Sequence, residues 1–345
     1  MTTPANDADP LLPSDPLELH GMKAGTSAND HGPFRAASTV APADLTDSIV
    51  VSVPAEDTVR CRTPWPEALL GLPFGDGLHA DVLVPNGDGP FPIVVFVPGG
   101  GFVLSPRSAA LIRRTAIAER DFVVVSIEYR TLRNGTVMDG VFDVATAIDW
   151  VRSRAADFGG DPSRVALWGE SAGGFLSAMA VTTGAVRDLR CVVDTFGLTD
   201  LSCVAMDFDV VEQARHHSPD ITEAQYVFGR DSGTTILDDP DAVQRVNPVR
   251  HVSGAEPPFL LFHGEVDGLV SPGQSQLLHQ ALLAAGVDST RYVVAGAGHY
   301  GVEWSSDTVL EIIAEFLDSH LNDHLNDHLN GHLNDRANDH LGGTP

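Results

Sequence analysis

Short apolar runs alternate with longer stretches of helical periodicity through the middle of the chain. Two of the runs, residues 93–97 and 122–128, are almost continuously apolar, as expected for strands that are buried on both faces. This alternation predicts an α/β fold, with a mostly parallel central sheet flanked by helices. The predicted strands are residues 49–53, 78–84, 93–97, 122–128, 164–168, 191–196, 259–262 and 291–294.

Apolar residues also recur at three- and four-residue spacing between the strands. This spacing predicts amphipathic helices over residues 141–151, 271–285 and 309–316. From residue 200 to residue 251 the pattern loosens into acidic, helix-prone pieces. We interpret residues 200–251 as a small lid insertion that lies over the end of the sheet, not as a second domain.

The two ends of the chain lack this pattern. Residues 1–44 are rich in Pro, Ala, Asp, Ser and Thr, which predicts a flexible leader. Residues 320–345 form a low-complexity tail that repeats His-Leu-Asn-Asp. Histidines at this spacing could bind Ni, Cu or Zn on one helical face, but we favour a solvated repeat without function. The folded domain is therefore predicted to span residues 45–319.

The charge and cysteine content exclude several classes of function. The 345 residues include 21 Lys and Arg against 47 Asp and Glu, a net charge of −26. Such a surface repels phosphate groups, so neither nucleic acid nor a membrane is expected as a partner. Three cysteines without a C-x-x-C pair disfavour a disulfide framework or a zinc site, and no cofactor or metal is predicted. No secretory signal pattern and no apolar run of ~18 residues is visible, so a cytoplasmic protein is expected.

A serine between a predicted strand and a helix is the first candidate for chemistry. The segment Gly169-Glu-Ser-Ala-Gly follows the predicted strand 164–168 directly. A tight turn there leaves little room around Ser171, which accounts for the glycines two residues to either side, and it exposes the hydroxyl at the positive end of the next helix. A glycine-rich turn with an incidental serine is the alternative, which this setting disfavours. Ser171 is the predicted nucleophile.

A serine hydroxyl needs a base to accept its proton, and a histidine base needs an acid to orient it. His299 comes just after the last predicted strand, and Asp267 comes just after the strand before it. Both residues are therefore expected where the strand ends converge. Glu265 is the second choice for the acid and Asp200 a more distant third. The sequence predicts a triad of Ser171, His299 and Asp267.

Acyl transfer also requires hydrogen-bond donors for the oxyanion that forms when the serine attacks. The loop Pro98-Gly-Gly-Gly-Phe offers consecutive backbone N–H groups that no side chain obstructs. We predict an oxyanion hole from the backbone N–H groups of Gly100, Gly101 and Ala172. A nucleotide-binding loop is disfavoured because no Lys-Ser/Thr pair follows the glycines. Phe102 beside this loop either contacts substrate or packs under the lid.

These segments together resemble an α/β-hydrolase of the carboxylesterase type, related to hormone-sensitive lipase and to the acetyl and feruloyl esterases. The resemblance covers about two-thirds of the chain, from residue 93 to residue 316. The segments that carry it are Pro98-Gly-Gly-Gly-Phe, Glu128-Tyr-Arg, Asp161-Pro-Ser-Arg-Val-Ala-Leu-Trp-Gly-Glu-Ser-Ala-Gly-Gly, Gly197-Leu-Thr-Asp-Leu, Asn247-Pro, Pro257-Pro-Phe-Leu-Leu-Phe-His-Gly-Glu-Val-Asp and Gly296-Ala-Gly-His.

The resemblance implies a serine esterase that cleaves carboxylic esters of small to medium acyl groups through an acyl-enzyme, with a small-molecule ester as its partner. It gives Ser171, His299 and Asp267 the roles of nucleophile, base and orienting acid. An amide-bond hydrolase of the formamidase or peptidase type would use the same triad. A non-catalytic ligand-binding member of the fold is a third interpretation, which the presence of all three residues disfavours.

Two departures from the family pattern bear on the site. Pro98 stands where the family usually has histidine before the three glycines. The glycine amides would still stabilise an oxyanion, with a changed loop geometry. Residues 131–138 replace a segment that is typically proline-rich and that borders the pocket, so the substrate preferences of the family transfer least well there.

Overall fold

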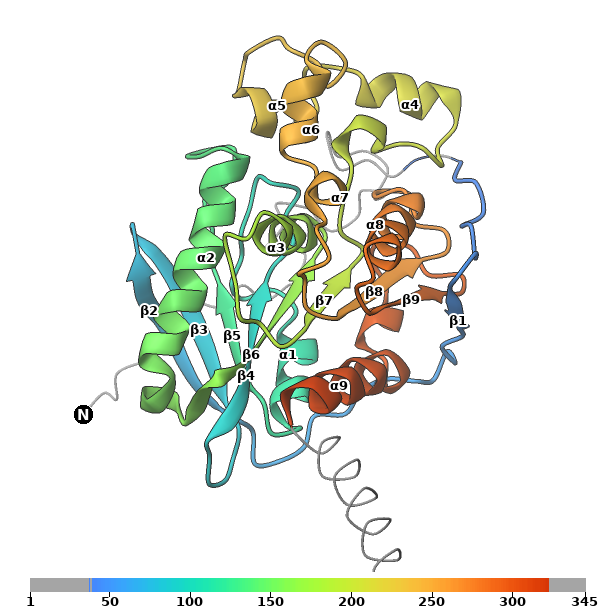
Figure 1. Ribbon diagram of the computed structural model, residues 1–345. Helices are drawn as coiled ribbons and strands as arrows, with labels where there is room; N and C mark the ends of the chain where they lie inside the picture. The colour runs from blue at the N-terminus through green and yellow to red at the C-terminus, as the bar shows by residue number, and fades with distance from the viewer. Residues whose placement is uncertain (1–36, 38, 323–345) are drawn as a thin grey trace, which may run out of the picture.

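The computed structural model in Figure 1 describes residue 37 and residues 39–322. Within this part of the chain, nine strands form one sheet in the order β1-β9-β8-β7-β6-β4-β5-β3-β2. β3 is antiparallel to both of its neighbours, and the other pairs are parallel, so the predicted mostly parallel sheet is confirmed. The strands are β1 (Ile49–Val51), β2 (Glu67–Gly75), β3 (Leu78–Val84), β4 (Phe91–Val97), β5 (Val123–Ile127), β6 (Gly160–Glu170), β7 (Val192–Thr195), β8 (Phe259–Gly264) and β9 (Ser289–Val294).

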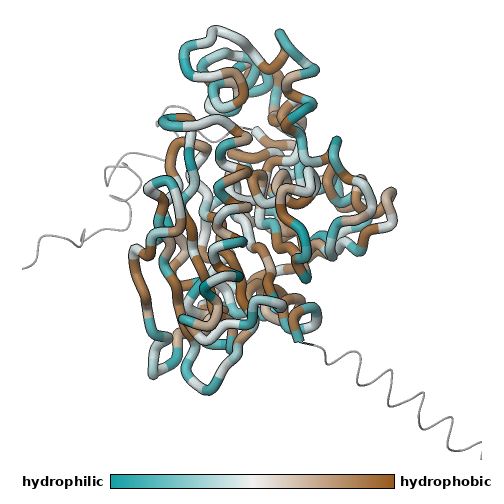
Figure 2. Tube along the Cα trace, turned by 60° about the vertical axis from the view of Figure 1, so that its left-hand side comes forward, coloured by the Kyte–Doolittle hydropathy of each residue, from teal (hydrophilic) through white to brown (hydrophobic). Residues whose placement is uncertain are grey.

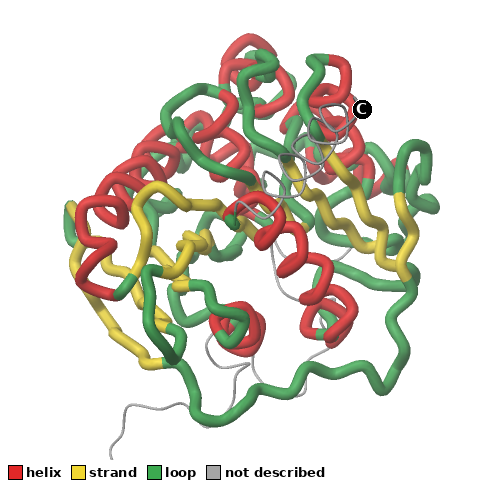
Figure 3. The backbone as a smooth tube through the Cα atoms, turned by 60° about the horizontal axis from the view of Figure 1, so that its bottom comes forward, coloured by secondary structure: helices red, strands yellow, loops and turns green. Residues whose placement is uncertain are grey.

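Helices cover both faces of the sheet, as Figures 1 and 3 show. α2, α3 and α8 pack on one face, and α1 and α9 pack on the other. The helices are α1 (Leu111–Ala118), α2 (Val137–Arg154), α3 (Ala172–Thr182), α4 (Val210–His216), α5 (Thr222–Phe228), α6 (Pro240–Arg245), α7 (Pro248–His251), α8 (Gly273–Ala284) and α9 (Asp307–Leu321), with short 3-10 helices at η4 (Ala155–Phe158), η5 (Leu201–Cys203) and η6 (Val302–Ser305).

The apolar runs explain why the sheet has two covered faces. Successive residues of a strand point to opposite faces, so a strand that is apolar throughout feeds two hydrophobic cores. In β4, Val95 belongs to the core under α2 and α3, whereas Val94 and Phe96 belong to the core under α1 and α9. Figure 2 shows the hydrophobic positions running through the centre of the molecule, with hydrophilic positions at the outer turns.

Each of the eight strands predicted from the sequence corresponds to an observed strand, but β2 was not predicted. This edge strand pairs only with β3, and its register shifts between Leu69 and Leu72. Most of its residues are at least partly exposed, and it contains Gly71 and Pro73, two residue types that are rare within strands. β2 therefore lacks the continuous apolar run by which β4 and β5 were recognised.

The described residues extend beyond the predicted domain bounds of 45 and 319 at both ends. Val40 forms a bridge with Phe208, and the Ala41 N–H donates to the Asp207 carbonyl at 2.7 Å, so the end of the predicted leader packs on the insertion. α9 continues to Leu321, which is buried, so the first histidine of the tail repeat lies in this helix. Residues 1–36, 38 and 323–345, with the rest of the His-rich repeat, lie outside the described residues.

The segment between β7 and β8 carries the predicted insertion. It holds η5 and the four short helices α4 to α7, and Figure 1 shows α4, α5 and α6 beyond the ends of β7 and β8, on the side where α3 begins. Helices this short depend on tertiary contacts for their stability, which agrees with the loose apolar pattern of the sequence here. Among residues 39–322, no helix combines the length and the apolar character needed to span a bilayer.

Candidate active site

Ser171 lies on the sharp turn between β6 and α3. Its backbone has φ 54° and ψ −122°, a conformation that residues with a side chain rarely adopt. The turn is held by the Ser171 N–H, which donates to the Thr195 carbonyl at 2.9 Å, and by the Phe175 N–H, which donates to the Ser171 carbonyl at 3.1 Å. This strained turn directs the serine away from the strand and places its hydroxyl at the carboxyl edge of the sheet.

The glycines of the G-x-S-x-G segment are required by close packing. A Cβ atom on Gly173 would lie 2.0 Å from the Val97 carbonyl oxygen, and one on Gly169 would lie 2.5 Å from the Gly173 carbonyl oxygen. Both distances are shorter than any real contact of a Cβ atom. The backbone of the turn therefore touches β4 and α3 directly, as the sequence pattern indicated.

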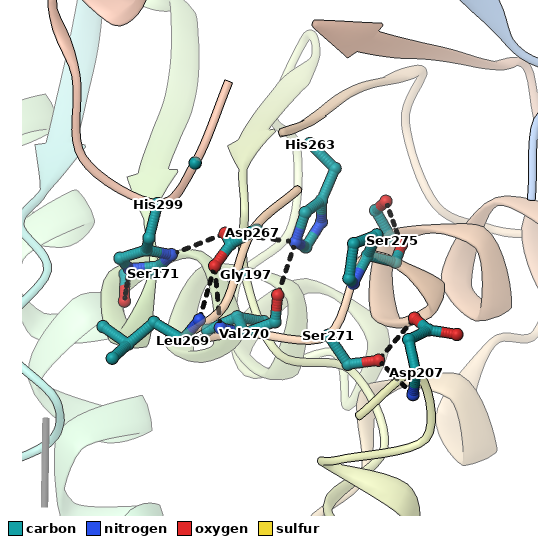
Figure 4. A network of polar contacts seen from close by, with 12 residues as sticks. Ser171, Gly197, Asp207, His263, Asp267, Leu269, Val270, Ser271, Ser275 and His299 are labelled. Atoms are coloured by element: carbon teal, nitrogen blue, oxygen red, sulfur yellow. Dashed lines mark hydrogen bonds and ion pairs between the residues drawn. The ribbon is translucent and has the colours of Figure 1, made fainter. Parts of the chain in front are cut away.

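The structure brings His299 and Asp267 to Ser171 (Figure 4). The Ser171 hydroxyl lies 3.0 Å from His299 Nε2, and His299 Nδ1 lies 2.7 Å from Asp267 Oδ2. Because a carboxylate only accepts hydrogen bonds, Nδ1 carries the proton, and Nε2 is left with a lone pair that faces the serine. The three side chains thus form one continuous hydrogen-bonded chain.

The surroundings of His299 fix the plane of its ring. His299 is 5% exposed, and the ring of Phe196 lies 4.5 Å from it, centroid to centroid. Tyr300 packs edge-on against the same ring at 5.0 Å. An imidazole held in this way keeps Nε2 directed at the serine during a reaction, without a search through other rotamers.

Asp267 is fully buried and remains charged. Its Oδ1 accepts hydrogen bonds from the N–H groups of Leu269 and Val270 at 2.8 and 2.9 Å. Burial alone would raise the pKa of Asp267, but its electrostatic and hydrogen-bonding interactions with His299 and His263 outweigh burial and hold this pKa well below its usual range. The carboxylate can therefore balance a positive charge on His299.

The two other candidates for the acid have different partners. Glu265 accepts a hydrogen bond from the Gly296 N–H at 2.8 Å. Asp200 caps η5 through Ser202 and accepts from the Asn247 side chain at 2.6 Å. Of the three carboxylates considered from the sequence, Asp267 is the one that contacts His299.

The loop with the predicted oxyanion donors lies against Ser171. A Cβ atom on Gly99 would be 3.1 Å from Ser171 Cβ, which shows how closely the loop passes. Among the described residues, the N–H groups of Gly100, Gly101 and Ala172 donate to no acceptor. Gly100 and Gly101 both have positive φ, which turns this part of the loop sharply. These amides thus remain available to a bound group.

Pro98 stands at the position where the family usually has histidine. A tyrosine side chain holds its carbonyl group. The Tyr129 hydroxyl donates to the Pro98 carbonyl at 2.8 Å and lies 3.3 Å from the Leu104 carbonyl. The Leu132 N–H, from the segment that departs from the family pattern, donates to the Phe102 carbonyl at 2.9 Å. The two ends and the centre of the loop are therefore each held by a hydrogen bond.

Removing the tyrosine hydroxyl should loosen this loop. We expect Tyr129→Phe to lower kcat for an ester about 10-fold with little change in KM, because the donors for the oxyanion would be less well positioned. Stability should fall by about 1–2 kcal/mol, since the Pro98 carbonyl would be left buried and unpaired. Tyr292→Phe is a matched control: its ring stacks on Phe262 in another part of the sheet. Equal kcat values for the two variants would contradict a role for Tyr129 in the loop.

Phe102 packs under the insertion, which decides between the two alternatives left open by the sequence. It is 1% exposed, and its ring stacks on Tyr226 of α5 with the centroids 4.9 Å apart. The Tyr226 hydroxyl donates to the Arg130 carbonyl at 2.9 Å. α5 therefore contacts the glycine loop after β4 through the rings of Tyr226 and Phe102.

Two further contacts at the site were not recognised from the sequence. Glu170, the residue before the nucleophile, forms a bidentate ion pair with Arg113 of α1 at 2.7 and 2.9 Å. His263, at the end of β8, lies 3.4 Å from the Asp267 carboxylate on the side away from His299. The sequence holds a weak signal for His263, its place in the segment His263-Gly-Glu-Val-Asp. Arg113 has none, because only the fold brings α1 to the serine.

Within the described part of the chain, no group of three or more His, Cys, Asp or Glu side chains is arranged to hold an ion. His320 is the one histidine of the tail repeat among the described residues. Its Nδ1 donates to the Phe316 carbonyl of the same helix at 2.7 Å.

Several known proteins are similar to this chain in sequence. Among curated proteins, the chain is 27% identical to a probable isoprenylcysteine alpha-carbonyl methylesterase of Arabidopsis thaliana, over 62% of this chain and 52% of that protein. It is 31% identical to esterase LipC of Mycobacterium tuberculosis, over 61% of this chain and 53% of that protein. The aligned part spans about half the length of these relatives.

Solved structures give the same fold. A truncated carbohydrate esterase from gut microbiota superposes with a TM-score of 0.65 at 24% identity, and 77% of this chain and 98% of that chain are covered. Esterase Est2 of Thermogutta terrifontis superposes with a TM-score of 0.57 at 23% identity, over 75% of this chain and 94% of that chain. At these identities the likeness shows the α/β-hydrolase fold.

The family follows from a model that matches more than half of the chain. The BD-FAE family model matches residues 80–282, a range that includes Ser171 and Asp267 and ends before His299. The match agrees with the resemblance found in the sequence and with the fold of the solved structures. The chain therefore belongs to the BD-FAE family, an esterase family related to hormone-sensitive lipase, and has the α/β-hydrolase fold.

Proposed function

We propose that this protein is a serine esterase that cleaves carboxylic esters of small to medium acyl groups. The observation that carries the proposal is the hydrogen-bonded chain from Ser171 through His299 to Asp267. The esterase names of the relatives, and the carbohydrate esterase among the solved structures, support an ester over other substrates. The acyl range follows from the resemblance to the acetyl and feruloyl esterases.

The first half of the reaction forms an acyl-enzyme. Ser171 Oγ attacks the ester carbonyl while His299 Nε2 takes the serine proton. The negative charge of Asp267 stabilises the imidazolium that results, and its hydrogen bond to Nδ1 keeps the ring in place. His299 then gives the proton to the departing alcohol, and the acyl group remains on the serine.

The second half repeats these steps with water. Water attacks the acyl-enzyme, His299 takes the water proton, and the serine receives it as the acid departs. In both halves the N–H groups of Gly100, Gly101 and Ala172 stabilise the oxyanion. Losing one such donor typically costs about 10²–10³ in kcat.

The insertion is proposed to act as a lid over the site. It lies beyond the ends of β7 and β8 (Figure 1), and α5 contacts the oxyanion loop through Tyr226 and Phe102. A lid that packs on this loop would limit the space for the acyl group and exclude water from the developing charge. The folded domain of residues 45–319 would then be one catalytic unit with residues 200–251 as its cover.

A serine-directed fluorophosphonate probe and a graded panel of chromogenic esters test the proposal. We expect covalent labelling at Ser171, located by mass spectrometry, and turnover of acetate and butyrate esters above that of long-chain esters. Faster turnover of a matched anilide than of the ester would favour the amide-bond hydrolase instead. A folded protein that the probe does not label, and that hydrolyses neither ester nor anilide, would identify a non-catalytic member of the fold.

A further inference from the structure

The acid of the proposed triad lies between two imidazoles. His299 contacts Asp267 Oδ2 from one side at 2.7 Å, and His263 Nε2 faces the same oxygen from the other side at 3.4 Å (Figure 4). His263 comes from the end of β8, and its side chain is fully buried. The same Nε2 lies 3.1 Å from the Val270 carbonyl oxygen. One nitrogen of His263 therefore has two acceptors and no donor near it.

These contacts fix the tautomer of His263. A carboxylate oxygen and a carbonyl oxygen can only accept, so Nε2 must carry a proton, which it donates to the Val270 carbonyl while it also faces Asp267 Oδ2. The other nitrogen, Nδ1, is buried and has no hydrogen-bond partner among the described residues. A proton on Nδ1 would be a buried donor without an acceptor, which is costly. His263 therefore acts as a donor at Nε2 and leaves Nδ1 as a lone pair.

The donor from His263 completes the surroundings of the carboxylate. Oδ1 already accepts from the N–H groups of Leu269 and Val270, and Oδ2 accepts from His299. With His263, each oxygen of Asp267 faces two donors. Val270 contacts both residues: its N–H donates to Asp267 Oδ1, and its carbonyl accepts from His263 Nε2. The acid, the loop after it and His263 thus form one closed network.

We propose that His263 is a positioning residue that sets the orientation and the effective charge of Asp267, and through it the basicity of the triad. This inference rests on the serine esterase mechanism proposed above. His263 would act in two ways. Its Nε2–H, which faces Oδ2 at 3.4 Å, attracts that oxygen and so favours the carboxylate plane in which Oδ2 points at His299 Nδ1. It also draws part of the negative charge of Oδ2 toward itself, so that less of that charge stabilises the imidazolium.

Two neutral polar substitutions distinguish the effect of the hydrogen-bond donor of His263 from the effect of the size of its side chain. The amide nitrogen of glutamine can reach the position of Nε2, so His263→Gln keeps a donor to Asp267. Asparagine is shorter, and its amide reaches only the position of Nδ1, so His263→Asn loses that donor but stays polar. Circular dichroism and thermal unfolding would establish that both variants are folded.

The expected result is a loss in His263→Asn that His263→Gln restores. The contact of the Nε2–H with the carboxylate is longer than a strong hydrogen bond to a charged group, so we expect kcat/KM of His263→Asn for a chromogenic ester to fall by about 10-fold. The fall should be in kcat, with KM nearly unchanged, because Asp267 does not contact substrate. The acid limb of the pH profile of kcat/KM should move to higher pH, since the full carboxylate charge would then stabilise the imidazolium. His263→Gln should stay within about threefold of the parent.

The proposal would be overturned if folded His263→Asn kept the parent kcat and pH profile, or if His263→Gln lost as much activity as His263→Asn. A parallel loss of stability and activity in both variants, with an unmoved pH profile, would give His263 a purely structural role and would equally overturn it. Failure of the esterase mechanism itself gives a different result, because the parent protein would then neither label with fluorophosphonate nor turn over ester.

Discussion

Replacing Ser171 with alanine is expected to lower kcat for a chromogenic short-chain ester by about 10⁵- to 10⁶-fold and to leave the fold intact. In the proposed mechanism the hydroxyl is the group that attacks, and no other part of the turn can replace it. His299 and Asp267 would keep their contact at 2.7 Å, because that hydrogen bond does not involve the serine. Ser319→Ala, a change on the exposed side of α9, is a matched control that should keep full activity.

The same position allows a test of the strained turn. Alanine keeps the Cβ atom and therefore the cost of φ 54° and ψ −122°, whereas glycine adopts this conformation readily. We expect Ser171→Gly to be as inactive as Ser171→Ala but more stable than it by about 1 kcal/mol. Urea unfolding of the two inactive variants measures the difference directly. Kept turnover in Ser171→Ala would reject Ser171 as nucleophile, and a less stable glycine variant would contradict the strain.

The fold and the meeting of the three predicted site residues could be read from the sequence for one physical reason. Strands buried on both faces, such as β4 and β5, give continuous apolar runs, and parallel strands end at one edge. Residues that directly follow such strands must then lie near one another. Ser171 after β6, Asp267 after β8 and His299 after β9 meet in this way, although 128 positions separate the serine from the histidine.

The features of the fold and the site that the sequence did not predict depend on contacts between segments that lack a recognisable apolar pattern. Tyr129, two residues after the end of β5, and Tyr226 of α5 contact the loop of residues 98–104, and neither spacing nor composition distinguishes them from ordinary core residues. β2 was not predicted from the sequence because an exposed edge strand needs no continuous apolar run. Residues 39–44 look like the rest of the leader, yet the Ala41 N–H binds the insertion and the Asp44 carbonyl accepts from Arg291 at 2.8 Å.

A second large effect is expected from Asp194, a carboxyl group that the proposed mechanism does not use. It lies on β7 behind the nucleophile turn and is 2% exposed. Its Oδ1 accepts from the Gly197 N–H at 3.0 Å, and its Oδ2 is buried without a partner among the described residues. Cβ atoms on Gly174 and Gly197 would lie 2.2 and 2.4 Å from Oδ1, so the cavity fits the carboxyl group closely. Burial raises the pKa of Asp194 to about 7.

This pKa makes the stability of the protein depend on pH in a defined direction. In the unfolded chain the carboxyl group loses its proton near its ordinary pKa of 3.8, and in the folded chain near about 7. Between these values the folded state holds a proton that the unfolded state has released, so the free energy of unfolding falls as the pH rises through this window. The difference between the two pKa values corresponds to about 4 kcal/mol, lost in full above pH 7.

Asp194→Asn removes this titration and keeps the shape of the side chain. The variant should be close to the parent in stability near pH 4, and its advantage over the parent should grow by about 4 kcal/mol between pH 4 and pH 8. Urea unfolding at several pH values measures this difference, and Asp288→Asn, a change at an exposed aspartate, serves as control with a constant difference. Because both proteins share every other titrating group, their difference isolates Asp194. A constant gap between Asp194→Asn and the parent across this range would mean that the carboxylate is stabilised in the fold, and the turn behind Ser171 would then carry a buried negative charge at neutral pH.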